Sequence, residues 1–269
     1  VETSGFGLIV DGISVDTRAS SGPAGVWLLD PWNVEITTID SLTTNTGGVF
    51  SPNNTLAKIA ATTIETQLGT TSVTVNTTGA GGEDGNITVS TAITENGANL
   101  LTLDADNNIV LNEAITRSGT GGLKLDADNN VTINANISVT GSGVLDIDAG
   151  NLVTMNNGKT INASSGSSSV TLDAANGITL EGSIARSGTG SLAITSASKF
   201  INLTTNGSID HSGSGDVSFS SVQNITLTGN ITQSGGGDVS LVSSSGGVMD
   251  LGDVKMGSDS ATLTIDQAG

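Results

Sequence analysis

The chain carries short segments in which apolar and polar residues alternate, and these segments recur at a nearly constant interval. In residues 101–105 the first, third and fifth positions are apolar and the two between them are polar, which is typical of a β-strand with one buried face. The same pattern returns 22 residues later at 123–127 and again at 145–149. Further members begin at Val73, Val170, Leu192, Val217, Val239 and Leu263. The spacing therefore predicts a repeat of about 22 residues.

A second strand segment follows in most repeats, and an Ile closes the repeat six residues further on. The second segments begin at Ile87, Ile109, Val131, Ile178 and Ile225, and the closing residues are Ile93, Ile115, Ile137, Ile184 and Ile231. Strands in units of this length, with no helices between them, bury an apolar face only by stacking coil on coil. We therefore expect an all-β fold: a parallel β-helix, or solenoid, in which like residues stack about 4.8 Å apart.

This register makes specific predictions about neighbours in successive coils. Leu101, Leu123 and Leu145 should stack inward, as should Ile115 and Ile137. Between repeats lie glycine-rich turns at residues 117–121, 186–190, 211–215 and 233–237. We attribute these glycines to positive φ angles, which glycine adopts at low steric cost where the chain turns sharply.

Two polar columns follow from the same register. Asn107, Asn129, Asn151 and Asn176 each lie six residues after the start of a repeat, at the corner between the two strands, where stacked amides can bond to one another. Asp104, Asp126, Asp148 and Asp173 each lie three residues after the start, on the outer face. Such a carboxylate column faces solvent or collects cations, because like charges repel by about 1 kcal/mol per neighbouring pair in water.

Residues 1–72 do not keep the period, and they contain all three prolines and both tryptophans. Apolar residues from Leu56 to Leu68 recur at helical spacing and predict one short amphipathic helix. The strand that contains Trp27 is apolar on both sides, so we expect this helix to cover its outer side. We interpret residues 1–269 as a single solenoid, with irregular coils and an inserted loop at 1–72 and regular coils at 73–269.

Composition excludes several classes of function. The 269 residues have a net charge of −18, which argues against nucleic acid and anionic lipid as partners. There is no cysteine, so disulfides and thiolate chemistry are excluded, and aromatic residues make up only 2% of the chain. No apolar run is long enough to span a membrane as a helix. The chain begins without an initiator Met and ends in a strand pattern cut short of its next turn, so we expect an excerpt or processed piece of a longer protein.

Few residues are candidates for chemistry, and we assign no catalytic, cofactor-binding or metal-binding residue. The single histidine, His211, occupies a turn position taken elsewhere by Arg117, Arg186 and Gln233, so we interpret it as an exposed turn residue. Lys124 shares the outer face with the Asp column but has no aromatic platform beside it. Weak calcium binding by the Asp column stays an alternative to a solvated acidic face. Ice binding is disfavoured because the column that starts at Thr102 is chemically mixed, and glycosylation of the many Asn-x-Ser/Thr sites stays open.

Residues 25–31 of the irregular start read Gly-Val-Trp-Leu-Leu-Asp-Pro, residues 63–68 read Thr-Ile-Glu-Thr-Gln-Leu, and residues 71–77 read Thr-Ser-Val-Thr-Val-Asn-Thr. With these motifs the irregular start resembles a segment of large bacterial filamentous-haemagglutinin-like exoproteins, in which a short helix and a Thr-x-Val-Thr-Val-x-Thr strand follow the Trp-Leu-Leu-Asp-Pro strand. Residues 237–241 are similar to the repeats of that family. The resemblance implies a secreted, right-handed β-helix used in adhesion, of the two-partner secretion type, exported by an outer-membrane pore.

We therefore expect a non-catalytic segment of a secreted or cell-surface adhesin or stalk, without a cofactor. Its expected partners are a host, neighbour-cell or matrix surface and, for the full-length protein, the export pore. A second hypothesis is a self-assembling extracellular filament subunit that associates end to end. A carbohydrate-active β-helix enzyme is a third.

Overall fold

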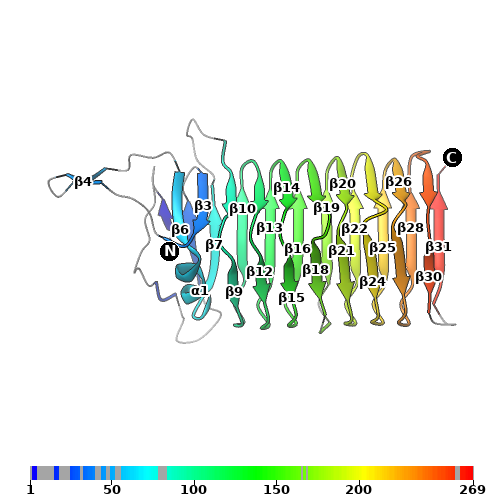
Figure 1. Ribbon diagram of the computed structural model, residues 1–269, viewed down its shortest axis with the longest axis horizontal. Coiled ribbons are helices and arrows are strands. Elements are labelled where there is room, and N and C mark those ends of the chain that lie inside the picture. Colours follow the sequence, from blue (N-terminus) through cyan, green and yellow to red (C-terminus); the bar gives the residue numbers. More distant parts are fainter. Residues whose placement is uncertain are drawn as a thin grey trace.

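The computed structural model describes residues 2–4, 15–17, 25–30, 33–39, 44–46, 49–51, 56–77, 84–164, 166–167, 169–257 and 261–268. It is a parallel β-solenoid of about nine turns, with about 23 residues in each turn. Successive coils stack along one axis, and short turns join the strands at the edges of the stack (Figure 1). The predicted all-β stacked-coil architecture is confirmed.

Three parallel sheets run along the solenoid, and each coil from β7 to β30 contributes one strand to each of them. The first sheet contains β1 (Glu2–Ser4), β2 (Val26–Asp30), β7 (Ser72–Asn76), β10 (Leu101–Ala105), β13 (Leu123–Ala127), β16 (Leu145–Ala149), β19 (Val170–Ala174), β22 (Leu192–Ser196), β25 (Val217–Ser221), β28 (Val239–Ser243) and β31 (Leu263–Gln267). The second contains β6 (Leu56–Ala60), β3 (Asn33–Thr37), β8 (Ile87–Val89), β11 (Ile109–Leu111), β14 (Asn130–Ile133), β17 (Leu152–Met155), β20 (Gly177–Leu180), β23 (Phe200–Leu203), β26 (Asn224–Leu227) and β29 (Met249–Leu251).

The third sheet is built from the segments around the closing Ile of each repeat. It contains β9 (Ile93–Glu95), β12 (Ile115–Arg117), β15 (Ile137–Val139), β18 (Thr160–Ala163), β21 (Ser183–Arg186), β24 (Ser208–His211), β27 (Asn230–Gln233) and β30 (Val254–Met256). A separate antiparallel pair, β4 (Thr44–Thr46) and β5 (Val49–Ser51), lies in the insertion between β3 and β6. The sequence pattern had indicated two strands in each repeat, and the structure has three.

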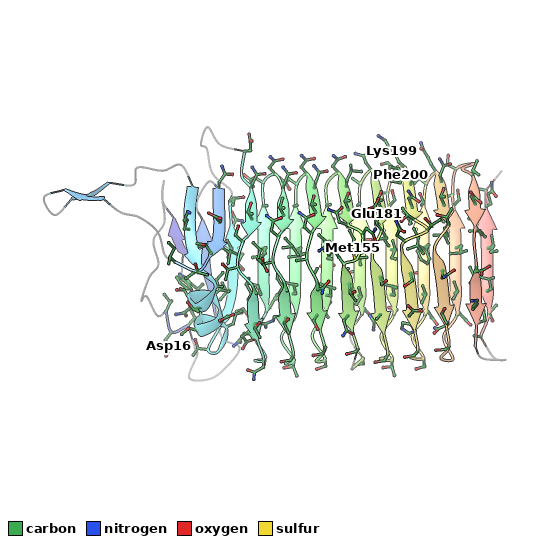
Figure 2. The ribbon with its side chains drawn as sticks, viewed as in Figure 1. Asp16, Met155, Glu181, Lys199 and Phe200 are labelled. Carbon is green, nitrogen blue, oxygen red and sulfur yellow. The ribbon has the colours of Figure 1, made fainter. Side chains whose placement is uncertain are left out.

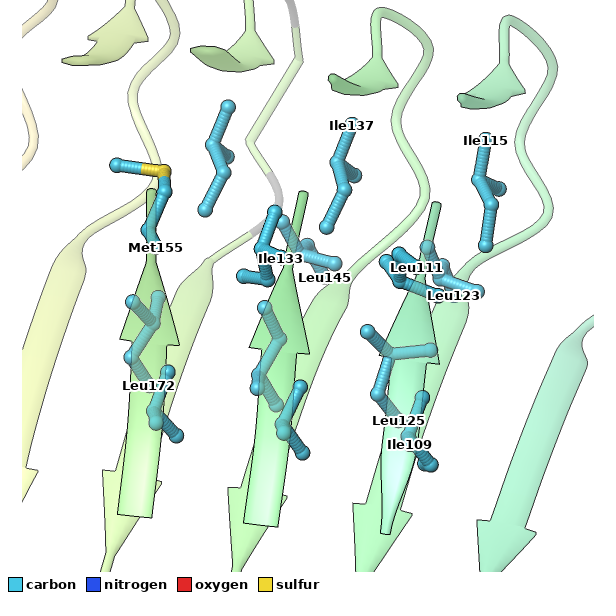
Figure 3. Packing of buried hydrophobic residues seen from close by; sticks show 14 of the residues in the cluster. Ile109, Leu111, Ile115, Leu123, Leu125, Ile133, Ile137, Leu145, Met155 and Leu172 are labelled. Atoms are coloured by element: carbon cyan, nitrogen blue, oxygen red, sulfur yellow. The ribbon is translucent and has the colours of Figure 1, made fainter. Parts of the chain in front are cut away.

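The predicted register is confirmed in the core. Leu101 pairs with Leu123, and Leu123 pairs with Leu145, all fully buried. Ile115 and Ile137 occupy equivalent places in successive coils (Figure 3). One cluster of buried hydrophobic residues extends from Trp27 to Leu241. Burial of each such side chain contributes about 1.5–3 kcal/mol, so stacking supplies the stability that no single coil has.

The predicted helix is shorter than expected. Residues 56–60 form strand β6, and only Ala61–Leu68 form helix α1. The helical spacing misleads over residues 56–60 because Ala57 and Ile59 are both buried, which also suits a strand, and β6 pairs with β3 in parallel.

The helix is also in a different place from the one predicted. It does not form an outer cover for the Trp27 strand; it packs mainly against β9, β7 and β6. In chain order it lies between β6 of the second sheet and β7 of the first sheet. It therefore fills the position that a third-sheet strand has in later coils. Ile64 and Leu68 are fully buried in the same core cluster as Trp27. The outward side chains of β2, and Trp32, lie outside the described residues.

The reason given above for the turn glycines is wrong. Among described residues, positive φ occurs only at Gly85, Gly158, Gly166 and Gly246. None of these glycines lies in the turns at residues 117–121, 186–190, 211–215 and 233–237. Those turns require glycine because successive coils approach closely. A Cβ on Gly213 would lie 1.8 Å from the carbonyl oxygen of Gly188 in the preceding coil, far inside van der Waals contact.

Candidate functional site

The outer face of the first sheet carries an acidic stripe, which we define as Asp104, Asp126, Asp148 and Asp173. These residues pair directly from one strand to the next, as the sequence predicted. Lys124 lies on the same face, with its Nζ 2.8 Å from Oδ2 of Asp126. The stripe therefore combines carboxylates spaced one strand apart with a single lysine beside them.

Partial burial and mutual repulsion change the proton affinity of two carboxylates of the stripe, Asp104 and Asp148. Burial raises the pKa of Asp104, and Asp126 adds to this shift, whereas a hydrogen bond from Asn76 at 2.7 Å opposes it. Burial also raises the pKa of Asp148, with further contributions from Asp126 and Asp173. The hydrogen bond to Asp126 raises the pKa of Lys124. Ionisation of Asp104 and Asp148 is therefore less favourable in the folded chain than in the unfolded chain.

We expect Asp148→Asn to raise the free energy of unfolding at pH 7 slightly, by less than about 1 kcal/mol. Because its pKa is raised in the folded state, Asp148 takes up a proton at a higher pH in the folded chain than in the unfolded chain. The difference in the free energy of unfolding between variant and wild type should therefore shrink as the pH falls toward the ordinary pKa of Asp, about 3.9. Urea unfolding at several pH values measures this, with Asp253→Asn, outside the stripe, as the control. A loss of stability at pH 7 would contradict the expectation.

The stripe does not assemble a metal site by itself. In the part of the chain that the structure describes, no group of three or more His, Asp or Glu side chains is placed to hold a metal ion. Neighbouring carboxylates lie in one straight column instead of surrounding a point, whereas Ca²⁺ takes six to eight oxygen ligands.

The predicted asparagine column exists at the corner between the first and second sheets. Nδ2 of Asn129 donates to Oδ1 of Asn107 at 2.9 Å, Asn151 donates to Asn129 at 3.0 Å, and Asn176 donates to Asn151 at 3.0 Å. Each of these three amides donates to the preceding coil. The ladder therefore ties four successive coils together at one corner.

Two further ladders were not predicted. In one, Asn108 donates to Asn86, Asn130 to Asn108 and Asn151 to Asn130, each at 2.9 Å. In the other, at the end of the second sheet, Asn134 donates to Asn112 at 2.9 Å and Asn156 to Asn134 at 2.5 Å. Asparagines 22 residues apart in the sequence, such as Asn112 and Asn134, could have indicated these ladders. They were missed because they lie outside the strand motif on which the repeat was aligned.

Asn129→Ala is expected to lower the free energy of unfolding by on the order of 1 kcal/mol, because it removes the two amide bonds to Asn107 and Asn151. Asn206→Ala, at an exposed turn outside the ladders, is the control and should change little. Equilibrium unfolding in urea compares the two. Equal effects would show that the ladder adds no stability.

The interpretation of His211 as an exposed turn residue is wrong. Its side chain points inward and is 1% exposed, and the equivalent Arg117, Arg186 and Gln233 are also buried. Each is the last residue of a third-sheet strand, two positions after the inward Ile. Alternation therefore turns it into the core, and the polar character of the side chain concealed this. We call these four residues the buried polar column.

Each member of the buried polar column has its own partners. Arg117 forms an ion pair with Glu95 and donates to the carbonyl of Asn99. Arg186 donates to the carbonyls of Gly190 and Ser191, both at 3.0 Å. Burial lowers the pKa of both arginines, and Glu95 opposes the shift of Arg117; a guanidinium nevertheless stays charged in proteins. The two buried guanidinium groups are thus held by separate sets of acceptors within their own part of the solenoid.

Surface depressions lie on the outside of the described coils. One of about 340 Å³ lies at a corner between Leu100 and Val144, where Gly122 leaves space between two partly exposed apolar side chains. Side chains otherwise line the coils at regular intervals along the axis (Figure 2). No helix among the described residues is both long and apolar enough to cross a membrane.

Comparison with known proteins gives no match: neither a family model, nor a curated protein, nor a solved structure is significantly similar to this chain.

Proposed function

We propose that this chain is a non-catalytic segment of a secreted or cell-surface adhesin, acting as a stalk that provides reach and surface for attachment. The partner in this proposal is a host cell, a neighbouring cell or an extracellular matrix. The proposal combines the solenoid architecture with the resemblance of the irregular start to filamentous-haemagglutinin-like exoproteins. In this chain, strand β2 carries the Trp-Leu-Leu-Asp order on which that resemblance rests.

The observation that carries the proposal is the continuity of the stack. About nine turns at about 4.8 Å each give a rod of roughly 40 Å. Backbone pairing joins each coil from β7 to β30 to its neighbours in three sheets, and the Asn ladders add side-chain bonds at the corners. A rod of this kind suits a mechanical role, because load is shared among many parallel hydrogen bonds.

The arrangement of reactive groups also favours a non-catalytic role. His211 lies inside the core, so its ring has no access to a substrate. The outer carboxylates follow the repeat without interruption, whereas an acid–base pair needs two carboxyl groups in different environments. Export through an outer-membrane pore belongs to the same proposal and is supported by the family resemblance alone.

A bead-attachment assay tests the proposal. Beads that carry the folded chain are applied to cell monolayers and to immobilised matrix, with and without an excess of soluble chain. Saturable attachment that soluble chain inhibits is the result expected of an adhesive segment. Attachment no greater than that of uncoated beads on every surface would remove the adhesive part of the proposal. Release of reducing ends from polysaccharides by the purified chain would contradict the non-catalytic part.

A further inference from the structure

An apolar depression lies on the outside of the solenoid where strands β13 and β16 begin. Leu100, Gly122 and Val144 stack there in three successive coils, each one residue before the first residue of its strand. Leu100 is 40% exposed and Val144 47%. Because Gly122 between them has no side chain, a space of about 340 Å³ stays open. Exposed apolar walls around a depression of this size suit an apolar side chain of another molecule.

A second depression, of about 290 Å³, lies at the opposite ends of the strands of the same sheet. Small residues of three successive coils form most of its lining: Ala149, Gly150, Ala174, Ala175 and Ala197. Alanine and glycine carry no side-chain atom beyond Cβ, so the space above them stays open. Asp148 and Asp173 line the same depression, which places two carboxylates of the acidic stripe beside an apolar floor.

The spacing of the two depressions matches an extended chain that lies across the sheet. Val144 precedes β16 and Gly150 follows it, so the depressions are roughly 20 Å apart along the strands. The first depression is centred on the coil of β13 and the second on the coil of β19, two coils or roughly 10 Å apart. A line between them crosses the strands at roughly 25°, near the angle of about 30° at which extended chains pack face to face.

Carboxylates line the path between the two depressions. Asp146 and Asp148 are the outward residues of β16, and Asp173 lies next to Asp148 on β19. Burial raises the pKa of Asp148, and the neighbouring carboxylates add to this shift. Lys124, the cation beside the first depression, is already paired with Asp126. Charge complementarity therefore favours a partner that is basic between two apolar ends.

We propose that the outer face of β13, β16 and β19 is a docking surface for an extended basic segment of a partner protein, with an apolar residue at each end. Alternate residues of an extended segment face the same side. The first and seventh residues of such a segment therefore reach the two depressions, while lysine or arginine at the third and fifth positions meets Asp146 and Asp148. This docking does not require the proposed adhesive role: attachment to cells and binding of a basic peptide can each fail without the other.

Fluorescence anisotropy of a labelled peptide, Leu-Thr-Lys-Thr-Lys-Thr-Leu, tests the proposal at low ionic strength, where exposed charges attract most strongly. The double variant Asp146→Asn, Asp148→Asn should bind the peptide about fivefold more weakly or worse, because two exposed charge pairs are lost. Val144→Ser should weaken binding about threefold, because it removes one apolar wall. Asp250→Asn, Asp253→Asn makes the same change of net charge on exposed residues of another coil and should bind like wild type.

Two altered peptides separate docking from general attraction to a chain of net charge −18. Wild type should bind the peptide with serine at both ends more weakly than the one with leucine, and should not bind the peptide with glutamate in place of lysine. Equal binding of the serine and leucine peptides, or no binding of the leucine peptide, would overturn the proposal, as would equal weakening by the two double variants. The peptide comparison uses the wild-type chain, so its outcome holds even if a variant fails to fold.

Discussion

Glu95→Ala is expected to lower the free energy of unfolding by about 3–5 kcal/mol, because it leaves the Arg117 guanidinium buried without its counter-charge. The two side chains are 7% and 1% exposed, so water cannot replace the lost carboxylate. The remaining bond from Arg117 to the carbonyl of Asn99 satisfies only part of the guanidinium. Urea unfolding measures the loss.

Two variants separate a buried charge from a general packing defect. The double variant Glu95→Ala, Arg117→Val should recover much of the loss, because Val139 already occupies the position next to Arg117 in the following coil. Glu35→Gln, which breaks the partly exposed pair with Lys58 at 3.1 Å, should cost less than about 1 kcal/mol. A double variant as unstable as the single one would contradict this explanation.

Gly141→Ala is expected to destabilise the chain by about 3 kcal/mol or more, as overpacking does when the neighbouring atoms cannot move away. Its Cβ would lie 1.6 Å from the carbonyl oxygen of Gly119 in the preceding coil. Relief requires the two coils to separate at this corner, which weakens their backbone pairing.

Gly236→Ala is the matched control for that substitution. Gly236 lies in another of the interrepeat turns, is exposed and has no atom within 4 Å of an added Cβ. Its φ is not positive, so alanine should be neutral or slightly stabilising. Equal losses at the two positions in equilibrium unfolding would show that glycine is needed for chain flexibility and not for close approach.

The stacking register could be predicted from the sequence because the repeat of about 22 residues coincides with the two-residue alternation along each strand. Leu101 and Leu123 are separated by one coil, and the alternation within each strand fixes which residues point inward. The Asp and Asn columns then follow without further assumptions. The third sheet is harder to detect, because the second inward position of strands such as β12 and β24 holds a polar residue, Arg117 or His211, so that each strand shows only one apolar inward residue.

The candidate polar groups were harder to place than the apolar ones. His211 and Arg117 stand next to glycine-rich turns, and polar side chains at turns usually face solvent. These two side chains nevertheless point into the core, because alternation along the strand sets their direction. An adjacent coil or a turn then supplies each with a buried hydrogen-bond partner. The place of helix α1 could not be inferred either, since it depends on the free edge of β9, where Glu65 accepts a hydrogen bond from the backbone of Thr94 at 2.7 Å.

The central claim is that interchangeable coils form a rod whose length sets its reach, and insertion of extra coils tests it most directly. Four additional copies of residues 123–144, placed after Val144, keep the register of the stack: Leu123 of each copy pairs with Leu123 of the next, and Leu123 of the last copy pairs with Leu145 as it does in the native chain. A scrambled insert of the same composition is the control. Small-angle scattering should show the rod lengthened by roughly 19 Å, at about 4.8 Å per coil, with proportionally more β-structure by circular dichroism. Inserted copies that stay unstructured, like the scrambled control, would contradict the account.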